Sequence, residues 1–370
     1  GLNKRNPMIF DPYRLNLVTG EMEMIAENPG NIQGWGTDND GKLRVAVAIV
    51  DGVNTQVLYR ETESQPFRPV ITTNYKETVG YSLFTPDNKE VYAISNLGRD
   101  KLALVRMDPA TATELEVLYT NDKYDISNVS ANRVTKELEA VSYVGHKDRV
   151  RHYFNEDFKN KVTKLESKLP GYSVGISSTD KLEEVWIVTA SNDRQRPTYY
   201  VYDTRTDELT KIAESAPWIK AEEMAEMRPV TYQSRDGLTI EAYLTLPVGY
   251  TMENAKNLPV VVNPHGGPWA RDYWGFNPEI QFLANRGYAV FQMNFRGSTG
   301  FGRKFTEISY GEWGLTMQDD IIDGTQWLID KGIADPDRIA IYGASYGGYA
   351  TLMGIVKSPE LYAAAVDYVG

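Results

Sequence analysis

The chain of 370 residues contains no cysteine. This absence excludes disulfide frameworks, thiolate nucleophiles and thiolate metal sites. It leaves the compartment open, cytoplasmic or periplasmic and secreted, because an oxidising compartment does not require disulfides. Basic residues are also in the minority, since 39 Lys and Arg stand against 50 Asp and Glu and give a formal charge of −11. Without a basic stripe, nucleic acid and anionic membrane surfaces are disfavoured as partners.

Long apolar runs are absent as well. No stretch reaches the eighteen or so apolar residues of a membrane span, and the first residues lack the apolar core of a signal peptide. The hydrophobic content of 42% and aromatic content of 11% are typical of a globular protein with room for two domains. We therefore predict a soluble protein without a membrane partner.

Short β-branched and aromatic runs, separated by turn residues, dominate roughly the first 215 residues. Strands that run into a polar turn recur at intervals in the high forties, at Trp35, Phe84, Val129 and Ile176. This period suits the blades of a β-propeller, and a generic β-sandwich is the alternative. We predict a partial β-propeller of about four and a half blades over residues 1–220.

From residue 221 onward, after an acidic segment bounded by prolines, strands alternate with helices. This order predicts a doubly wound, largely parallel sheet, the N-terminal part of an α/β-hydrolase domain over residues 221–370. The fold class as a whole is mixed. The expected strands lie near 230–233, 239–246, 259–262, 288–293 and 339–342, and the expected helices near 277–286 and 316–331.

A glycine-rich turn joins an apolar run to a helical pattern of small residues in Gly343-Ala-Ser345-Tyr-Gly347. A serine on a sharp strand-to-helix turn projects its hydroxyl clear of the sheet, and small neighbours let the chain bend that tightly. Ser345 is therefore the candidate nucleophile. Acyl transfer creates a negatively charged oxygen, and the backbone N–H of Tyr346 is one candidate donor to it.

The second donor is expected in the loop after the strand near 259–262, where His265-Gly-Gly-Pro lies. We predict the N–H of Gly267 as this donor, with Gly266 allowing close backbone approach. His265 is expected to hold the loop through hydrogen bonds rather than to act as the catalytic base. An ordinary glycine-rich turn is the alternative for the serine motif alone, but the two motifs together favour an oxyanion site.

The remaining triad members are not found after the serine. An α/β-hydrolase presents serine, then acid, then histidine, whereas His146, His152 and His265 all precede Ser345. We assign the first two to a strand and a turn, and Asp367 comes one strand too early for the triad acid. We therefore expect the triad Asp and His to lie outside a chain that is truncated at both ends and inactive by itself.

Acidic clusters elsewhere are interpreted as solvated charge. Asp319, Asp320 and Asp323 fit the exposed N-terminal face of a helix. The pair Glu222-Glu223 could bind a free amino terminus, but it lies in the segment between the two halves, so solvation is preferred. We predict no metal site and no cofactor.

Four motifs together resemble the prolyl oligopeptidase family of serine peptidases, and the His-Gly-Gly-Pro variant is closest to its acylaminoacyl-peptidase branch. They are Asn263-Pro-His-Gly-Gly-Pro268, Asn294-Phe-Arg-Gly-Ser-Thr-Gly-Phe-Gly302, Gly332-Ile-Ala-Asp-Pro-Asp-Arg338 and Gly343-Ala-Ser-Tyr-Gly-Gly-Tyr349.

The resemblance implies a propeller that limits entry to oligopeptide substrates. It also implies attack by Ser345, an oxyanion held by the N–H groups of Gly267 and Tyr346, and an acyl-enzyme hydrolysed by water. An esterase of the same fold and a catalytically dead binding protein are the alternatives. Whether the protein is a homo-oligomer is left open.

Overall fold

The computed structural model describes residues 1–370, and the chain divides into two compact units, Gly1–Val141 and Ser142–Gly370. We describe each unit by itself. None of the helices has both the length and the apolar character needed to cross a membrane.

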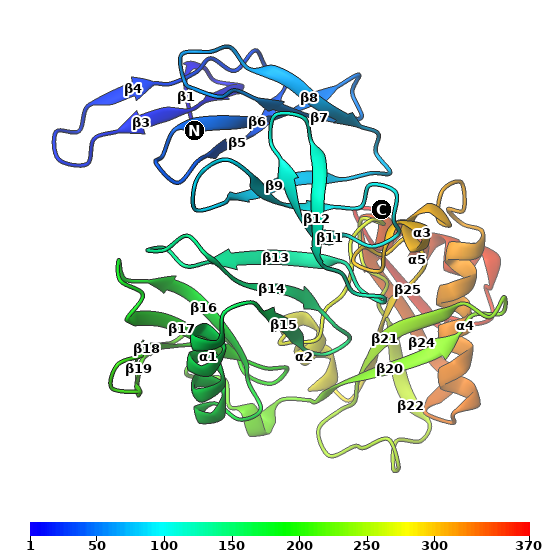
Figure 1. Cartoon of the computed structure of the whole chain (residues 1–370). Helices are drawn as coiled ribbons and strands as arrows, with labels where there is room; N and C mark the ends of the chain where they lie inside the picture. The colour runs from blue at the N-terminus through cyan, green and yellow to red at the C-terminus, as the bar shows by residue number, and fades with distance from the viewer. The chain divides into compact units, whose positions relative to one another are not determined.

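The first unit consists of small antiparallel sheets (Figure 1). Its strands are β1 (Leu2–Asn6), β2 (Ile9–Asp11), β3 (Tyr13–Leu15), β4 (Met22–Met24), β5 (Ile32–Thr37), β6 (Leu43–Val50), β7 (Asn54–Tyr59), β8 (Arg68–Thr73), β9 (Val79–Phe84), β10 (Val91–Ser95), β11 (Ala103–Asp108), β12 (Thr113–Tyr119), β13 (Ile126–Ala131) and β14 (Leu138–Val144), the last of which crosses into the second unit. Strands β5 to β8 form one four-stranded sheet in chain order, and β9 to β12 form another.

The repeat expected from the sequence is confirmed as a repeat of strands. The first strands of four successive sheets, β5, β9, β13 and β16 (Ser173–Thr179), begin at intervals of 47 residues. These strands contain the four predicted positions, Trp35, Phe84, Val129 and Ile176. The count of about four and a half propeller blades stays a prediction.

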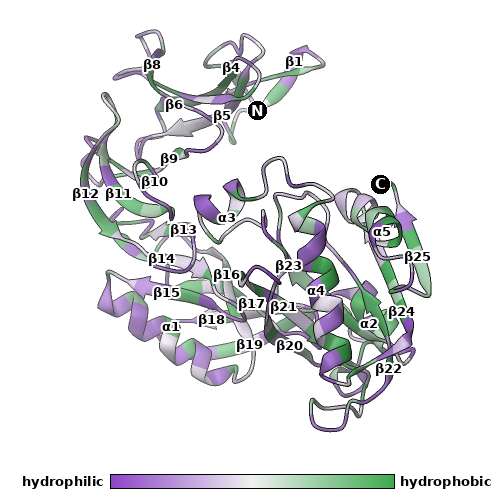
Figure 2. Ribbon diagram, turned by 90° about the vertical axis from the view of Figure 1, so that its right-hand side faces the viewer, coloured by the Kyte–Doolittle hydropathy of each residue, from purple (hydrophilic) through white to green (hydrophobic).

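One helix, α1 (Glu156–Lys168), lies where the sequence predicted only strands, after β15 (Arg149–Tyr153). Asn155 caps it by accepting a hydrogen bond from the Phe158 N–H, and two acidic residues occupy its first turn, where negative charge is favoured. Val162 and Leu165 are buried, whereas most of the helix is hydrophilic (Figure 2). The cap and the helical spacing were present in the sequence, but the surrounding β repeat hid them.

The last sheet of this type is built from β16, β17 (Val185–Ser191), β18 (Thr198–Asp203) and β19 (Glu208–Glu214) in chain order. Trp186 and Tyr202 of this sheet share a core with Val162 and Leu165 of α1. The helix therefore covers the sheet with its only buried side chains.

A six-stranded sheet occupies the rest of the second unit. Its elements are the short 3₁₀ helix η1 (Ala221–Glu223), β20 (Met227–Gln233), β21 (Thr239–Thr245), β22 (Leu258–Val262), α2 (Pro278–Ala284), β23 (Ala289–Asn294), α3 (Arg303–Glu307), α4 (Thr316–Asp330), β24 (Ala334–Ala344), α5 (Tyr346–Lys357) and β25 (Ala364–Tyr368). The strand order is β20-β21-β23-β22-β24-β25, and the last four strands pair in parallel. The predicted strands and helices of this half are confirmed.

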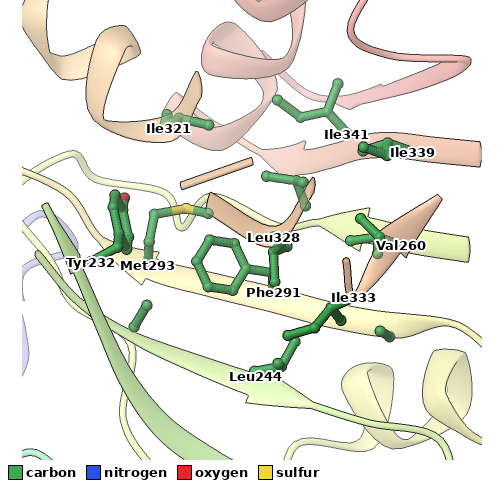
Figure 3. Packing of buried hydrophobic residues seen from close by; sticks show 14 of the residues in the cluster. Tyr232, Leu244, Val260, Phe291, Met293, Ile321, Leu328, Ile333, Ile339 and Ile341 are labelled. Atoms are coloured by element: carbon green, nitrogen blue, oxygen red, sulfur yellow. The ribbon is translucent and has the colours of Figure 1, made fainter. Parts of the chain in front are cut away.

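Helices cover both faces of this sheet. Leu244 and Phe291 belong to the core that includes α4 and α5 (Figure 3). Their strand neighbours Tyr243 and Val290 point to the opposite face, where they pack with Ile280 of α2. Because successive side chains of a strand alternate between faces, the doubly wound arrangement is confirmed.

Contacts across residue 220 tie the sheet β16–β19 to the six-stranded sheet. The Gln281 Nε2 donates to the carbonyl of Asp193 at 2.9 Å, and the Asp193 carboxylate accepts from the Met227 N–H at 2.7 Å. The ring of His146 lies 3.1 Å from the carbonyl oxygen of Ala242. The predicted boundary between residues 220 and 221 lies inside the second unit and stays a prediction.

Asp320 of α4 is buried in an ion pair, and Asp319 and Asp323 are half-buried in ion pairs, so the interpretation of the three as a solvated face was wrong. Asp320 is fully buried and accepts from the backbone N–H, Nε and Nη2 of Arg296 at 2.9, 2.9 and 2.7 Å. Asp323 and Asp319 both pair with Arg235, at 2.7 and 3.1 Å. The spacing of acidic residues on a helix does not show which arginines distant loops bring to it.

Replacing Asp320 by Asn keeps the shape of the side chain but leaves Arg296 facing only the half-exposed Asp236 at 2.9 Å. Removing one partner from a buried ion pair costs about 3–5 kcal/mol. We expect the free energy of unfolding, measured by urea titration, to fall by about 3 kcal/mol. Asp203→Asn breaks an exposed pair with Arg205 and should leave the urea midpoint almost unchanged. Equal losses in the two variants would contradict the assignment.

Candidate active site

Ser345 lies at the turn between β24 and α5, the position that the sequence predicted for it. Its backbone dihedrals, φ 56° and ψ −120°, are uncommon for a residue other than glycine. The Ser345 N–H donates to the carbonyl of Tyr368 in β25 at 2.9 Å, and its own carbonyl accepts from the Tyr349 N–H at 3.0 Å. Hydrogen bonds on both sides therefore hold the strained turn, and the side chain is exposed.

Two glycines of the serine motif are required by close backbone contacts. A Cβ on Gly343 would lie 2.4 Å from the carbonyl oxygen of Gly347, and a Cβ on Gly347 would lie 2.3 Å from the carbonyl oxygen of Pro264. Both distances are too short for a carbon atom. The chain can bend at Ser345 only because these positions carry no side chain.

The loop at His265-Gly-Gly-Pro contacts the serine turn, although the two motifs lie far apart in the sequence. A Cβ on Gly266 would be 3.5 Å from the Cβ of Ser345, and the Asn263 Nδ2 donates to the carbonyl of Tyr342 at 2.7 Å. The N–H groups of Gly267 and Tyr346 have no hydrogen-bond partner in the structure. Two backbone N–H groups of the serine turn and the glycine-rich loop are thus without an acceptor, as the predicted oxyanion site requires.

His265 is enclosed within this loop. Its Nδ1 lies 2.8 Å from the carbonyl oxygen of Gly266, its Nε2 lies 2.9 Å from the Ser298 hydroxyl, and its ring stacks on Phe295 at 4.4 Å. Burial lowers the pKa of His265 to about 4, so the ring is neutral at neutral pH. A carbonyl oxygen only accepts, so the proton of the neutral ring lies on Nδ1, and Nε2 shares the single hydrogen of the Ser298 hydroxyl with the Phe295 carbonyl, 2.7 Å from that hydroxyl. Both nitrogens are engaged, which supports a structural role and leaves that role a prediction.

Sequence reasoning missed the residues that tie the far end of the loop to the sheet. The Asp272 N–H donates to Asn294 Oδ1 at 2.8 Å, and Asn294 Nδ2 donates back to the Asp272 carbonyl at 3.2 Å. The Asp272 carboxylate accepts from Gln292 Nε2 at 3.0 Å, but its Oδ2 is buried without a partner. Burial raises the pKa of Asp272 to about 7. Asn294 opens one of the four motifs found in the sequence, but its contact with Asp272 could not be predicted, because an isolated Asp carries no motif.

Of the other residues considered from the sequence, Asp367 lies beside the serine turn, opposite Gly343 in the neighbouring strand. His152 lies in β15. Glu222 and Glu223 are exposed in η1, as predicted. Asp367 lies in β25 and accepts from the Gly370 N–H at 2.8 Å. No group of three His, Asp or Glu side chains in the structure is arranged to hold a metal ion.

A serine on a strained strand-to-helix turn, at the end of a central parallel strand, defines the fold class as that of the α/β-hydrolases. Residues 274–370 match the family model of the prolyl oligopeptidase family. The matched residues include the serine turn and strands β23 to β25.

Relatives match along the whole chain, among them the dipeptidyl peptidase family member 6 of Caenorhabditis elegans, which is 31% identical over 401 residues that cover 100% of this chain and 53% of that relative. The dipeptidyl aminopeptidase BIII of Pseudoxanthomonas mexicana is 35% identical over 381 residues, which cover 100% of this chain and 54% of the relative. The acylamino-acid-releasing enzyme of Arabidopsis thaliana is 34% identical over 113 residues, or 30% of this chain and 15% of the relative. The chain spans about half the length of the curated relatives that it matches throughout.

The crystal structure of puromycin hydrolase has a similar fold. It superposes with a TM-score of 0.72 at 21% identity, over 93% of this chain and 53% of that chain. The similarity extends over both units, so strand-rich sheets followed by a hydrolase sheet are the shared architecture.

Gly347→Ala should displace the loop at Pro264, because the new Cβ would lie 2.3 Å from that carbonyl oxygen. A misplacement of about 1 Å costs on the order of 10²-fold in rate. In the full-length protein we therefore expect labelling of Ser345 by a fluorophosphonate probe to slow on the order of 10²-fold. Gly80→Ala is the matched control, since no atom lies within 4 Å of its Cβ. Unchanged labelling of the Gly347 variant would refute the contact.

Asp272→Asn tests the raised pKa of the buried carboxyl. A folded pKa of about 7 lies above the unfolded value of about 4, so the wild-type protein loses stability as pH rises between these values. The Asn variant keeps Oδ1 as the acceptor for Gln292 and replaces Oδ2, which is unpaired in the wild type, by an uncharged NH₂ group. We expect its advantage in urea unfolding to grow between about pH 5 and 7 and then level off, on the order of 1–3 kcal/mol.

The control for this titration is Glu223→Gln, which removes an exposed carboxylate. It should leave the pH dependence of stability as it is in the wild type. A variant of Asp272 with the wild-type pH slope would show that this carboxyl titrates at its ordinary pKa.

Proposed function

We propose that the full-length protein containing this chain is a serine peptidase that hydrolyses short peptides through an acyl-enzyme on Ser345. The observation that carries the proposal is the close approach of the glycine-rich loop to the serine turn. A Cβ placed on Gly266 would lie only 3.5 Å from the Cβ of Ser345. That approach, with the exposed Ser345 hydroxyl and the unpaired N–H groups of Gly267 and Tyr346, supports these two groups as the oxyanion donors. An oxyanion site of this kind suits acyl transfer.

In the proposed mechanism the Ser345 hydroxyl attacks the scissile carbonyl and forms a bond from Oγ to the carbonyl carbon. The developing negative oxygen accepts hydrogen bonds from the N–H groups of Gly267 and Tyr346. The leaving amine departs with a proton, and water then hydrolyses the acyl-enzyme. Loop support by His265 and Gly266 keeps the first donor in place.

Removal of the Ser345 proton requires a base. His265 does not suit this role, because both of its ring nitrogens are engaged within the loop. We propose that the triad Asp and His lie outside this chain, and that the chain alone is therefore inactive. Loss of triad members typically costs on the order of 10⁴ or more in rate.

The proposed substrates are oligopeptides, and the partial β-propeller of residues 1–220 is proposed to limit their access. Release of dipeptides is favoured over release of acylamino acids, because a dipeptidyl aminopeptidase and a dipeptidyl peptidase family member both match the whole chain, while the acylamino-acid-releasing enzyme matches 30% of it. This revises the branch suggested by the His-Gly-Gly-Pro motif. The four small antiparallel sheets whose first strands begin at 47-residue intervals, three of them four-stranded and one three-stranded, support the propeller.

Ser345→Ala in the full-length protein should abolish fluorophosphonate labelling and lower kcat/KM on dipeptidyl nitroanilides by about 10⁴-fold or more. Ser358→Ala, at the opposite end of α5, is the control and should keep both. Acyl-nitrophenyl esters are assayed in parallel. Activity on the esters alone would exclude the peptidase, and labelling at another residue would exclude Ser345 as nucleophile.

A further inference from the structure

Aromatic rings gather beside the turn that carries Ser345. The Tyr346 ring meets the Trp313 ring edge-on, with centroids 5.1 Å apart. Trp313 lies 6.3 Å from Trp269, which in turn lies 5.9 Å from Tyr310. These separations fall in the range of favourable aromatic pairs. A continuous row of rings therefore runs from the residue after the serine to the loop after Gly267.

Two rings of this row are exposed to solvent, although burying their apolar surface would stabilise the protein. The side chains of Trp269 and Trp313 are 51% and 47% exposed, whereas Tyr346 is 5% exposed. Leaving a large apolar side chain in water costs about 25 cal/mol for each Å² of apolar surface. Trp269 follows Gly267 by two residues, and Trp313 rests on Tyr346. Exposed indole surface thus lies two residues along the chain from one predicted donor and against the ring of the residue that supplies the other.

The two indoles are also held in fixed orientations. The Trp269 Nε1 donates to the Ser309 hydroxyl at 3.2 Å, and that buried hydroxyl donates to the Thr306 carbonyl at 2.6 Å. Trp313 is held between the rings of Tyr346 and Tyr349, at 5.1 and 6.0 Å. A preset aromatic surface loses little conformational entropy when a ligand binds.

We propose that Trp269 and Trp313 form an aromatic subsite that takes a large apolar or aromatic side chain next to the scissile bond of the substrate. The inference rests on the proposed function, because it is the nearness of the two indoles to Ser345 that places the scissile bond there. A phenyl ring on the indoles would gain apolar contact and aromatic pairing that a methyl group cannot supply. The subsite would therefore favour Phe over Ala at that substrate position.

The test uses the full-length protein and pairs of peptide substrates that differ only by Phe or Ala, first before and then after the scissile bond. The measured quantity is the Phe-to-Ala ratio of kcat/KM. We expect the preference for Phe in only one of the two substrate pairs, either before or after the scissile bond. In that pair, Trp313→Ala and Trp269→Ala should each lower the Phe-to-Ala ratio about tenfold. Trp313→Phe should keep most of the preference. Trp218→Ala removes a 76% exposed indole outside the row and should leave the ratio unchanged.

Fluorophosphonate labelling separates this inference from the proposed function. If the Trp269 and Trp313 variants are labelled but keep the wild-type Phe-to-Ala ratio in both substrate pairs, the subsite is overturned. If their melting temperature also falls, the indoles serve packing instead. If wild-type Ser345 does not label, the proposed function fails. The subsite is then judged by calorimetric binding of uncleaved Phe and Ala peptides to Ser345→Ala, where an equal Kd for the two would refute it.

Discussion

The close backbone packing at the serine turn is the constraint on which the rest of the active-site region depends. No Cβ fits on Gly347, because the carbonyl of Pro264 would lie 2.3 Å from it. The same approach presses the glycine-rich loop against Ser345, whose φ of 56° must be held by neighbours. One of these neighbours is the Tyr368 carbonyl in β25, so the turn is stable only when the adjacent strand is in place.

Buried polar contacts behind the loop support this arrangement. Asp320 of α4 binds Arg296 through three hydrogen bonds. On either side of Arg296, Phe295 stacks on His265 and Ser298 contacts its Nε2. The helix and the loop are thus connected by one short segment. The ion pair of Arg296 with Asp320 is thus linked to His265 through the neighbouring residues Phe295 and Ser298.

Much of the fold could be predicted because local patterns and burial agree. The alternation of side chains and the turn residues identified the strands of both halves, and the 47-residue interval between first strands reflects the repeat in the sequence. Helix α1 was missed because its cap at Asn155 lies inside that repeat. The role of Asp320 was missed because an acidic residue on a helix has the same pattern whether water or a distant arginine balances it.

The sequence by itself determined the candidate nucleophile and its loop, since a bend this tight leaves room only for small residues at Gly343 and Gly347. Only the tertiary structure decided that His265 has both nitrogens engaged and that Asp272 carries a raised pKa, because burial and the partners of a polar group come from segments far apart in the chain. The aromatic row at Trp269 and Trp313 is of the same kind. Separate loops supply its rings, and no spacing in the sequence relates them.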